Sequence, residues 1–202
     1  MTLNGMPALH SEISPRYSQS QRFTHWTVAI IVLLVLAGGM TLGILGFKGV
    51  TETFGAPIRN LIYTYHKTFG LIVLVAMVLR LALRLKHGAP PYQPPLEAWQ
   101  ATISGLVHKA LYICLFAMPV LGWLATDAAD YPVEFFNWSL PQFIDKDKEL
   151  GALLYEAHEI VGWILAGLIA MHIGAALHHW LIKRDTVMRR MTLGSRAARR
   201  DD

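Results

Sequence analysis

The histidines are the residues of this chain whose type and placement point most directly to chemistry, and there are nine of them. Two, His178 and His179, close the last long apolar stretch of the sequence. An ionisable side chain inside such a stretch is costly and usually functional. Neutral imidazole is also a common ligand of transition metals. Five histidines lie inside the long apolar stretches: His25, His66, His108, His158 and His172.

The spacing between His158 and His172 is the most informative one. The two are fourteen positions apart, which is almost four whole turns of an α-helix. Both side chains therefore leave one face of the same helix, about 21 Å apart along its axis. That separation suits two stacked haem groups, one near each surface of a membrane. Because imidazole is a good axial ligand of haem iron, we predict that this helix gives one ligand to each of two b-type haems.

Each haem then needs a second histidine at a matching depth. Successive spanning helices run in opposite directions, so His25 lies near the same membrane surface as His172, and His66 near the same surface as His158. We therefore predict two ligand pairs, His25 with His172 and His66 with His158. The depth of His108 would also let it compete with His25.

Small residues support these four ligands, because a porphyrin face must approach the backbone beside its ligand. Tyr112, four positions after His108, is bulky and makes His108 the weaker candidate. The residues four positions after the four predicted ligands are all small: Ala29, Gly70, Gly162 and Ala176. Small residues are also ordinary packing devices in membrane helices.

Four apolar stretches must position these histidines, near residues 26–47, 61–85, 104–126 and 153–182. Each is long enough to cross a hydrocarbon core of roughly 30 Å as a helix of about 20 residues. The chain is 53% hydrophobic with a mean hydropathy of +0.37, which is too apolar for an ordinary soluble domain. We predict an all-α fold, an integral membrane four-helix bundle that binds two b-type haems.

The connections between these stretches carry clear signals. The first helix is expected to start near Phe23 and to fade in a glycine-rich region, and Pro119 is expected to kink the third. The acidic stretch 127–149 is the longest loop, with an aromatic middle suited to a membrane interface. We divide the chain into an N-terminal segment (1–22), a haem-binding domain (23–183) and a basic tail (184–202).

The charges predict the orientation in the membrane. Of the eighteen Lys and Arg residues, thirteen fall on the side that holds both termini. The positive-inside rule places that side in the cytoplasm of a bacterial inner membrane. The net charge of +4 then reflects topology and contact with anionic lipid, and we predict no nucleic-acid partner. The five on the other side are Lys48, Arg59, Lys67, Lys146 and Lys148.

The single cysteine, Cys114, excludes an intramolecular disulfide, and no C-x-x-C-H motif is present to attach a c-type haem. Any haem is therefore held by coordination alone. Arg80 and Arg84 lie at the inner end of the second helix, where they would either pair with haem propionates or set the topology.

The order of motifs resembles the bacterial cytochrome b561 family, which is similar to the cytochrome b subunit of nickel–iron hydrogenases. The resemblance covers about residues 16–192 and implies the same four ligands. Its motifs are Arg22-Phe-Thr-His25-Trp26, His66-Lys-Thr-Phe-Gly70, Arg80-Leu-Ala-Leu-Arg84-Leu-Lys86, Ala117-Met-Pro-Val-Leu-Gly122, His158-Glu, His172 and His178-His179-Trp180.

Within that family the sequence resembles the diheme superoxide oxidases, which implies oxidation of superoxide and reduction of ubiquinone. Lys67, beside an outer ligand, would either attract the anionic donor or extend its ammonium group to the membrane surface. His108 and His179, at the cytoplasmic depth, would bind quinone or relay a proton. The acidic outer loop suits an anionic donor less well, and the alternative function is a non-enzymatic relay between quinone and a partner dehydrogenase or soluble cytochrome.

Overall fold

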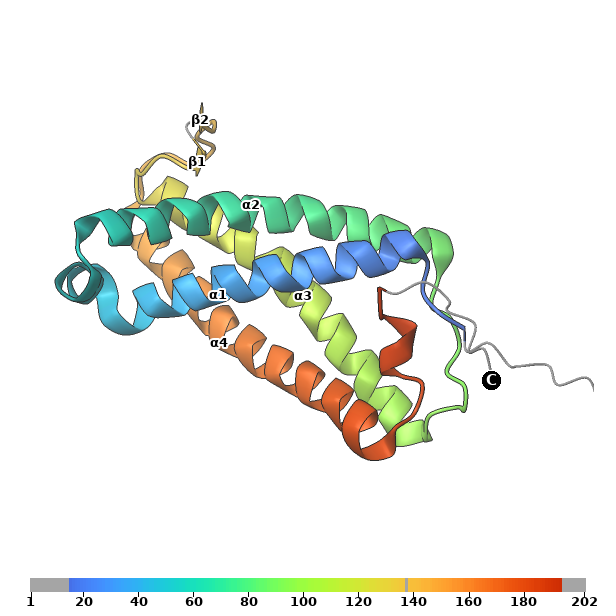
Figure 1. Ribbon diagram of the computed structural model, residues 1–202. Helices are drawn as coiled ribbons and strands as arrows, with labels where there is room; N and C mark the ends of the chain where they lie inside the picture. Colours follow the sequence, from blue (N-terminus) through green and yellow to red (C-terminus); the bar gives the residue numbers. More distant parts are fainter. Residues whose placement is uncertain (1–14, 137, 194–202) are drawn as a thin grey trace, which may run out of the picture.

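Four long helices form a bundle in the computed structural model, which describes residues 15–136 and 138–193 (Figure 1). All four are long and apolar enough to cross a membrane. The predicted all-α membrane bundle is thus confirmed. The helices are α1 (Gln19–Phe54), α2 (Ala56–His87), α3 (Ala98–Ala128) and α4 (Lys148–His178).

The helices pack mainly as two pairs, α1 with α2 and α3 with α4, and α2 also contacts α3. The pairs lie close together near the hairpin β1–β2 and diverge toward the opposite end (Figure 1). Buried apolar contacts at mid-depth join Val32 of α1 to Met77 of α2, and Leu111 of α3 to Leu165 of α4. Many large apolar side chains stay exposed on the outer surface, as a lipid-facing bundle requires.

The first helix is longer at both ends than the sequence predicted. It begins at Gln19, four residues before Phe23, because the Ser18 side chain caps its first turn. It also continues through the glycine-rich region to Phe54, with one break at Gly46. The φ angle of 65° at Gly46 lies in the left-handed region that glycine adopts without strain.

The connection between α3 and α4 closes one end of the bundle. It contains the short antiparallel strands β1 (Glu134–Phe135) and β2 (Trp138–Ser139). Asp127 is only 2% exposed. Its carboxylate accepts hydrogen bonds from the backbone N–H groups of Phe143 and Ile144, at 2.7 and 2.9 Å. This acidic residue therefore organises the loop from inside and adds nothing to its exposed charge.

A second acidic residue of this loop is also paired. The carboxylate of Asp130 bonds the ammonium of Lys146, and that hydrogen bond and positive charge hold the pKa of Asp130 below its ordinary value. The loop is consequently less acidic toward solvent than its composition suggests.

The opposite end is closed by residues 184–193, which we term the return segment. A five-residue π-helical turn, η1 (His179–Lys183), follows α4, and the chain then turns back through the short 3₁₀ helix η2 (Met188–Arg190) between the diverging helix pairs (Figure 1). Trp26 donates from its indole to the carbonyl of Met191 at 2.8 Å. The sequence analysis placed a basic tail from residue 184, and within it Arg190 and Met191 contact the rest of the bundle. Residues 1–14 and 194–202 lie outside the described part.

Arg190 connects the return segment to two other parts of the chain. Its side chain is only 3% exposed. The guanidinium lies 3.8 Å from the ring centre of Tyr92 and 5.3 Å from that of Tyr17, and it donates a hydrogen bond to the carbonyl of Pro90. Three separate parts of the chain therefore meet at this residue: the segment before α1, the α2–α3 connection and the return segment.

Candidate functional site

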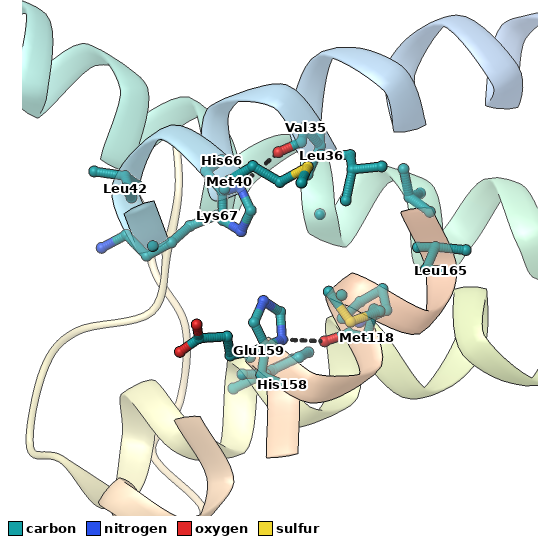
Figure 2. Close-up of a pocket in the computed structure, with 18 of the residues that line it drawn as sticks. Val35, Leu36, Met40, Leu42, His66, Lys67, Met118, His158, Glu159 and Leu165 are labelled. Atoms are coloured by element: carbon teal, nitrogen blue, oxygen red, sulfur yellow. Dashed lines mark hydrogen bonds between the residues drawn. The ribbon is translucent and has the colours of Figure 1, made fainter. Parts of the chain in front are cut away.

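His66 of α2 and His158 of α4 face each other across a cavity near the hairpin end of the bundle (Figure 2). Their ring centres are 6.0 Å apart, and the ring planes are inclined by 78°. The Nδ1 atom of His66 donates to the carbonyl of Val35, and that of His158 to the carbonyl of Met118, both at 3.0 Å. With Nδ1 carrying the hydrogen, each Nε2 keeps its lone pair, which is the arrangement typical of metal-ligating histidines.

The cavity between these rings measures about 320 Å³ and is lined by residues of all four helices. It has open space beside two glycines, because a Cβ atom added at Gly43 or Gly70 would meet nothing within 4 Å. The glycine predicted beside His66, Gly70, therefore borders free volume and does not merely pack against a neighbouring helix. The lining of the cavity is mainly apolar, as expected of a pocket for a large planar cofactor.

Two other glycines press against the backs of the rings. A Cβ atom at Gly39 would lie 2.7 Å from Cε1 of His66, and one at Gly122 would lie 3.0 Å from Cε1 of His158. Contacts this short force a ring to move. Glycine at these positions therefore lets each imidazole sit close to the neighbouring helix and reach the backbone carbonyl that orients it.

The second predicted pair, His25 of α1 and His172 of α4, also meets. The ring centres are 6.2 Å apart and the planes are inclined by 77°, almost the geometry of the first pair. Arg80 lies close enough to act electrostatically on both rings. We term the two places the outer site (His66 and His158) and the inner site (His25 and His172).

His108 of α3 joins the inner site at a different distance. Its ring centre is 5.1 Å from that of His172, and its Nδ1 donates to the carbonyl of Ser104 at 2.6 Å. Two imidazoles on opposite sides of one metal, with bonds of about 2 Å, have their ring centres about 6 Å apart. The separation between His108 and His172 is too short for that arrangement, whereas the separation between His25 and His172 fits it.

Both pairs therefore fit a haem held between two histidines. Each pair would hold one haem through its two imidazoles, and the outer cavity has free volume beside Gly43 and Gly70 that a porphyrin would need. The donors are neutral nitrogens, as in haem proteins whose iron has imidazole ligands. At the outer site, both rings are already oriented by backbone carbonyls.

Comparison with known proteins identifies the family. Residues 16–194 match the model of the family described as prokaryotic cytochrome b561. The chain belongs to this family. It is therefore a multi-pass bacterial membrane cytochrome of the b type that transfers electrons, and all four predicted ligands lie inside the matched range.

Three similar proteins span nearly the same length as this cytochrome. The cytochrome b561 homolog 1 of Escherichia coli strain K12 is 31% identical over 176 residues, which are 87% of this chain and 96% of the relative. The cytochrome b561 homolog 2 of the same strain is 27% identical over 177 residues, 87% and 90% of the two chains. A protein of Yersinia pestis named probable superoxide oxidase CybB is 23% identical over 177 residues, 87% and 96% of the two chains.

The two arginines predicted near the haem of this cytochrome have different surroundings. Arg80 lies beside the inner site, with its guanidinium 5.9 Å from the ring centre of Tyr112. Arg84, one turn nearer the end of α2, donates to the hydroxyl of Tyr17 at 3.1 Å. Arg80 thus lies between Tyr112 and the inner pair, whereas Arg84 connects α2 to the segment before α1.

Lys67 lines the outer cavity next to His66, as its sequence position suggested. Its side chain is only 9% exposed. The ammonium donates to the carboxylate of Glu134 at 3.2 Å and to the carbonyl of Pro132 at 3.1 Å. The positive charge expected to attract an anion is therefore compensated by the loop that covers the site.

His179 lies at the start of the π-helical turn, and its Nδ1 contacts the carboxylate of Asp185 in the return segment. The sequence singled out His179 but not its partner. The carbonyl acceptors at Val35 and Met118 were equally invisible, because any residue type offers a carbonyl. Only Gly39 and Gly122 left a signal, since both are glycines inside apolar helices, where glycine is otherwise unfavourable.

Proposed function

We propose that this cytochrome carries electrons across the membrane through two b-type haems, one at the outer and one at the inner site, and delivers them to ubiquinone. The observation that carries this proposal is the presence of two imidazole pairs with ring separations of 6.0 and 6.2 Å. The helix α4 contributes one residue to each pair, and these two residues, His158 and His172, are fourteen positions apart. When bound, haem supplies a one-electron redox couple at its iron.

The proposed electron donor is superoxide. The motif resemblance and the relative from Yersinia pestis, at 23% identity, support this choice. The charge of the outer loop is compatible with it, since Asp127 is buried and Asp130 and Glu134 are each paired with a lysine. Two superoxide ions would give two electrons and become two molecules of oxygen.

The proposed acceptor site is at the inner end. His108 and Arg80 adjoin the inner ligand pair. His179 directly follows the last residue of α4, seven positions beyond His172. Reduction of ubiquinone to ubiquinol consumes the two electrons and two protons. Imidazoles near the quinone oxygens suit both hydrogen bonding and proton transfer. We place this end, with both chain termini, in the cytoplasm, because thirteen of the eighteen Lys and Arg residues lie on its side.

The test is to purify the full chain in detergent, quantify haem per chain, and mix the oxidised protein with superoxide under a rapid optical probe. Two haems that are reduced by superoxide and reoxidised by ubiquinone are the expected result. One haem or none per chain would overturn the ligand assignment. Two haems that do not respond to superoxide would overturn the assignment of the donor.

A second function is supported by the surroundings of Lys67. Because Glu134 compensates this lysine, the outer site has little local attraction for a small anion. A non-enzymatic relay between quinol and a redox protein would not need that attraction. Reduction of the haems by quinol in a protein that ignores superoxide, together with co-purification of a redox partner, would support the relay.

A further inference from the structure

The contact between His179 and Asp185 joins the end of α4 to the return segment. Oδ2 of Asp185 bonds Nδ1 of His179. Its Oδ1 accepts the backbone N–H of Val187 at 3.0 Å, and its own N–H donates to the carbonyl of His179 at 3.2 Å. Both side chains are largely buried, with 12% of His179 and 20% of Asp185 exposed.

This arrangement fixes the imidazole in one orientation. An ionised carboxylate only accepts hydrogen bonds, so Nδ1 of His179 carries a hydrogen and Nε2 points away from Asp185. A carboxylate in this position holds the ring in one tautomer and orientation, as in other histidine–carboxylate pairs that transfer protons. The bond from the backbone N–H of Val187 to Oδ1 is enough to cap the return segment. The bond between Oδ2 and His179 is not needed for this capping.

The backbone around His179 is unusual as well. The helix α4 is regular up to His178 and continues from His179 to Lys183 as a π-helix. Short π-helical insertions are uncommon and occur frequently at functional sites. Here the wider turn ends in Arg184, in the left-handed conformation, and the next residue is Asp185. The irregular turn thus brings the carboxylate back to the imidazole.

We propose that Asp185 is a positioning residue that holds His179 as the proton donor to quinone. This inference rests on the proposed quinone site at the inner end. His179 is seven positions beyond His172, which is about 10 Å along a helix. A group bound between the inner ligands and the end of α4 is therefore within reach of Nε2 of His179.

The chemistry balances as follows. One ubiquinone takes up two electrons, which arrive singly through the inner site, and two protons. His179 donates one proton from Nε2 to a quinone oxygen and keeps the hydrogen on Nδ1, bonded to Asp185. It is then reprotonated from water at the cytoplasmic surface, and it can donate the second proton. Asp185 accepts the Nδ1 hydrogen bond throughout and keeps Nε2 directed away from itself.

The experiment uses the full chain in detergent with its haems chemically reduced under anaerobic conditions. Ubiquinone-1 is mixed in rapidly at a series of concentrations, and haem reoxidation gives a plateau rate and a half-saturating concentration. General acid catalysis contributes about 10²- to 10⁴-fold, so loss of its positioning in Asp185→Asn should lower the plateau rate by at least about 10-fold. Asp185→Glu should restore most of the rate. The half-saturating concentration and the affinity of the oxidised protein for ubiquinone-1 should stay within about 3-fold, under half of the 1.4 kcal/mol that a tenfold change represents.

Two controls separate this role from a structural one. Ferricyanide takes electrons without protons, so it should reoxidise Asp185→Asn at the wild-type rate. Thr186→Val removes another attachment of the return segment, the hydrogen bond to the carbonyl of Gln93, without touching His179. This variant should reduce ubiquinone normally, and equal slowing in Thr186→Val and Asp185→Asn would overturn the proposal.

His179→Gln distinguishes the failure of this inference from the failure of the proposed site. Slow quinone reduction in both His179→Gln and Asp185→Asn is the expected result. If His179→Gln alone is slow, Asp185 has no positioning role but the quinone site stands. If both variants react at the wild-type rate, quinone does not react beside His179, and the proposed quinone site at the inner end is wrong as well.

Discussion

The imidazoles of the outer site are oriented by the backbone of neighbouring helices. Each gives its Nδ1 hydrogen to a backbone carbonyl of a neighbouring helix, at Val35 or Met118, and each rests on a glycine. A main-chain acceptor is present whatever the type of the residue that carries it. The ordering of the two rings is thus a property of helix packing. Binding of a cofactor therefore loses little conformational entropy of these side chains.

Replacing single ligands should remove single haems. His66→Ala or His158→Ala should leave about one haem per chain, and so should His25→Ala or His172→Ala, because each variant takes one of two ligands from one iron. His108→Ala should keep both, since its ring lies only 5.1 Å from that of His172. The measurement is haem per chain by the pyridine haemochrome spectrum. Retention of two haems in His25→Ala with loss of one in His108→Ala would reverse the inner assignment.

A glycine behind a ligand should matter as much as the ligand. In Gly39→Ala the new methyl group would lie 2.7 Å from Cε1 of His66, so the ring must move and its bond to Val35 must weaken. We expect substantial loss of the outer haem, with the spectrum of the inner haem unchanged. Gly167→Ala, where a Cβ atom meets nothing within 4 Å, is the control. Equal haem content in both variants would contradict this account of the outer site.

At the scale of the elements, α4 and the two closing segments determine where the sites lie. The helix provides a predicted ligand at each depth. The β1–β2 connection contacts Lys67 at the outer site through Glu134, and the return segment contacts the inner end through Arg190 and Met191. Each closing segment carries charged groups whose partners are far away in sequence. The stability of each end therefore depends on few contacts.

Arg190 should be the most sensitive residue of the return segment. In Arg190→Ala the contacts with Tyr17, Tyr92 and Pro90 are all lost, and buried cation–π contacts contribute about 2 kcal/mol. We expect a lower thermal midpoint and faster proteolysis after residue 183, measured on the detergent-solubilised protein. Arg189→Ala is the matched control, because Arg189 is exposed. Equal stability of the two variants would show that the segment is held elsewhere.

The pair of Lys67 and Glu134 allows a test of the outer donor. In Glu134→Gln the lysine loses its compensating charge, and a positive charge at a cleft raises the rate of encounter with an anion. Reduction by superoxide should become several-fold faster at low salt than in the wild type, and the difference should shrink as salt rises. Lys67→Gln should be slower. A rate that is the same in all three proteins would exclude electrostatic steering by Lys67.

At the scale of the whole molecule, the distribution of charge makes a prediction about orientation. Both termini should face the cytoplasm, because the basic residues gather on that side. A fluorescent protein fused after Asp202 should therefore fluoresce, and alkaline phosphatase at the same place should be inactive. Alkaline phosphatase inserted in the β1–β2 connection should be active. The opposite pattern would exchange the outer and inner sites and reverse the proposed direction of electron flow.

The helices and the meeting of the two histidine pairs could be predicted from sequence. Both follow from the length of the apolar runs, the direction of successive helices and the helical repeat. A membrane span is an apolar run of known length, and alternating direction sets the depth of each histidine. The start at Gln19 was missed because capping by Ser18 adds a polar turn before the apolar run. The return segment was missed because its contacts, such as Trp26 with Met191, join positions far apart and mostly involve backbone carbonyls. The buried role of Asp127 was missed for the same reason.

One consequence of placing His158 and His172 on the same helix concerns evolutionary change in length. A single residue inserted between them would rotate one ring about 100° relative to the other and shift it by about 1.5 Å. Neither misalignment can be absorbed by a helix that is packed on both sides of the insertion. Divergence within the family should therefore tolerate insertions and deletions in the connections and exclude them from the fourteen-residue interval, however far the identities of its residues drift.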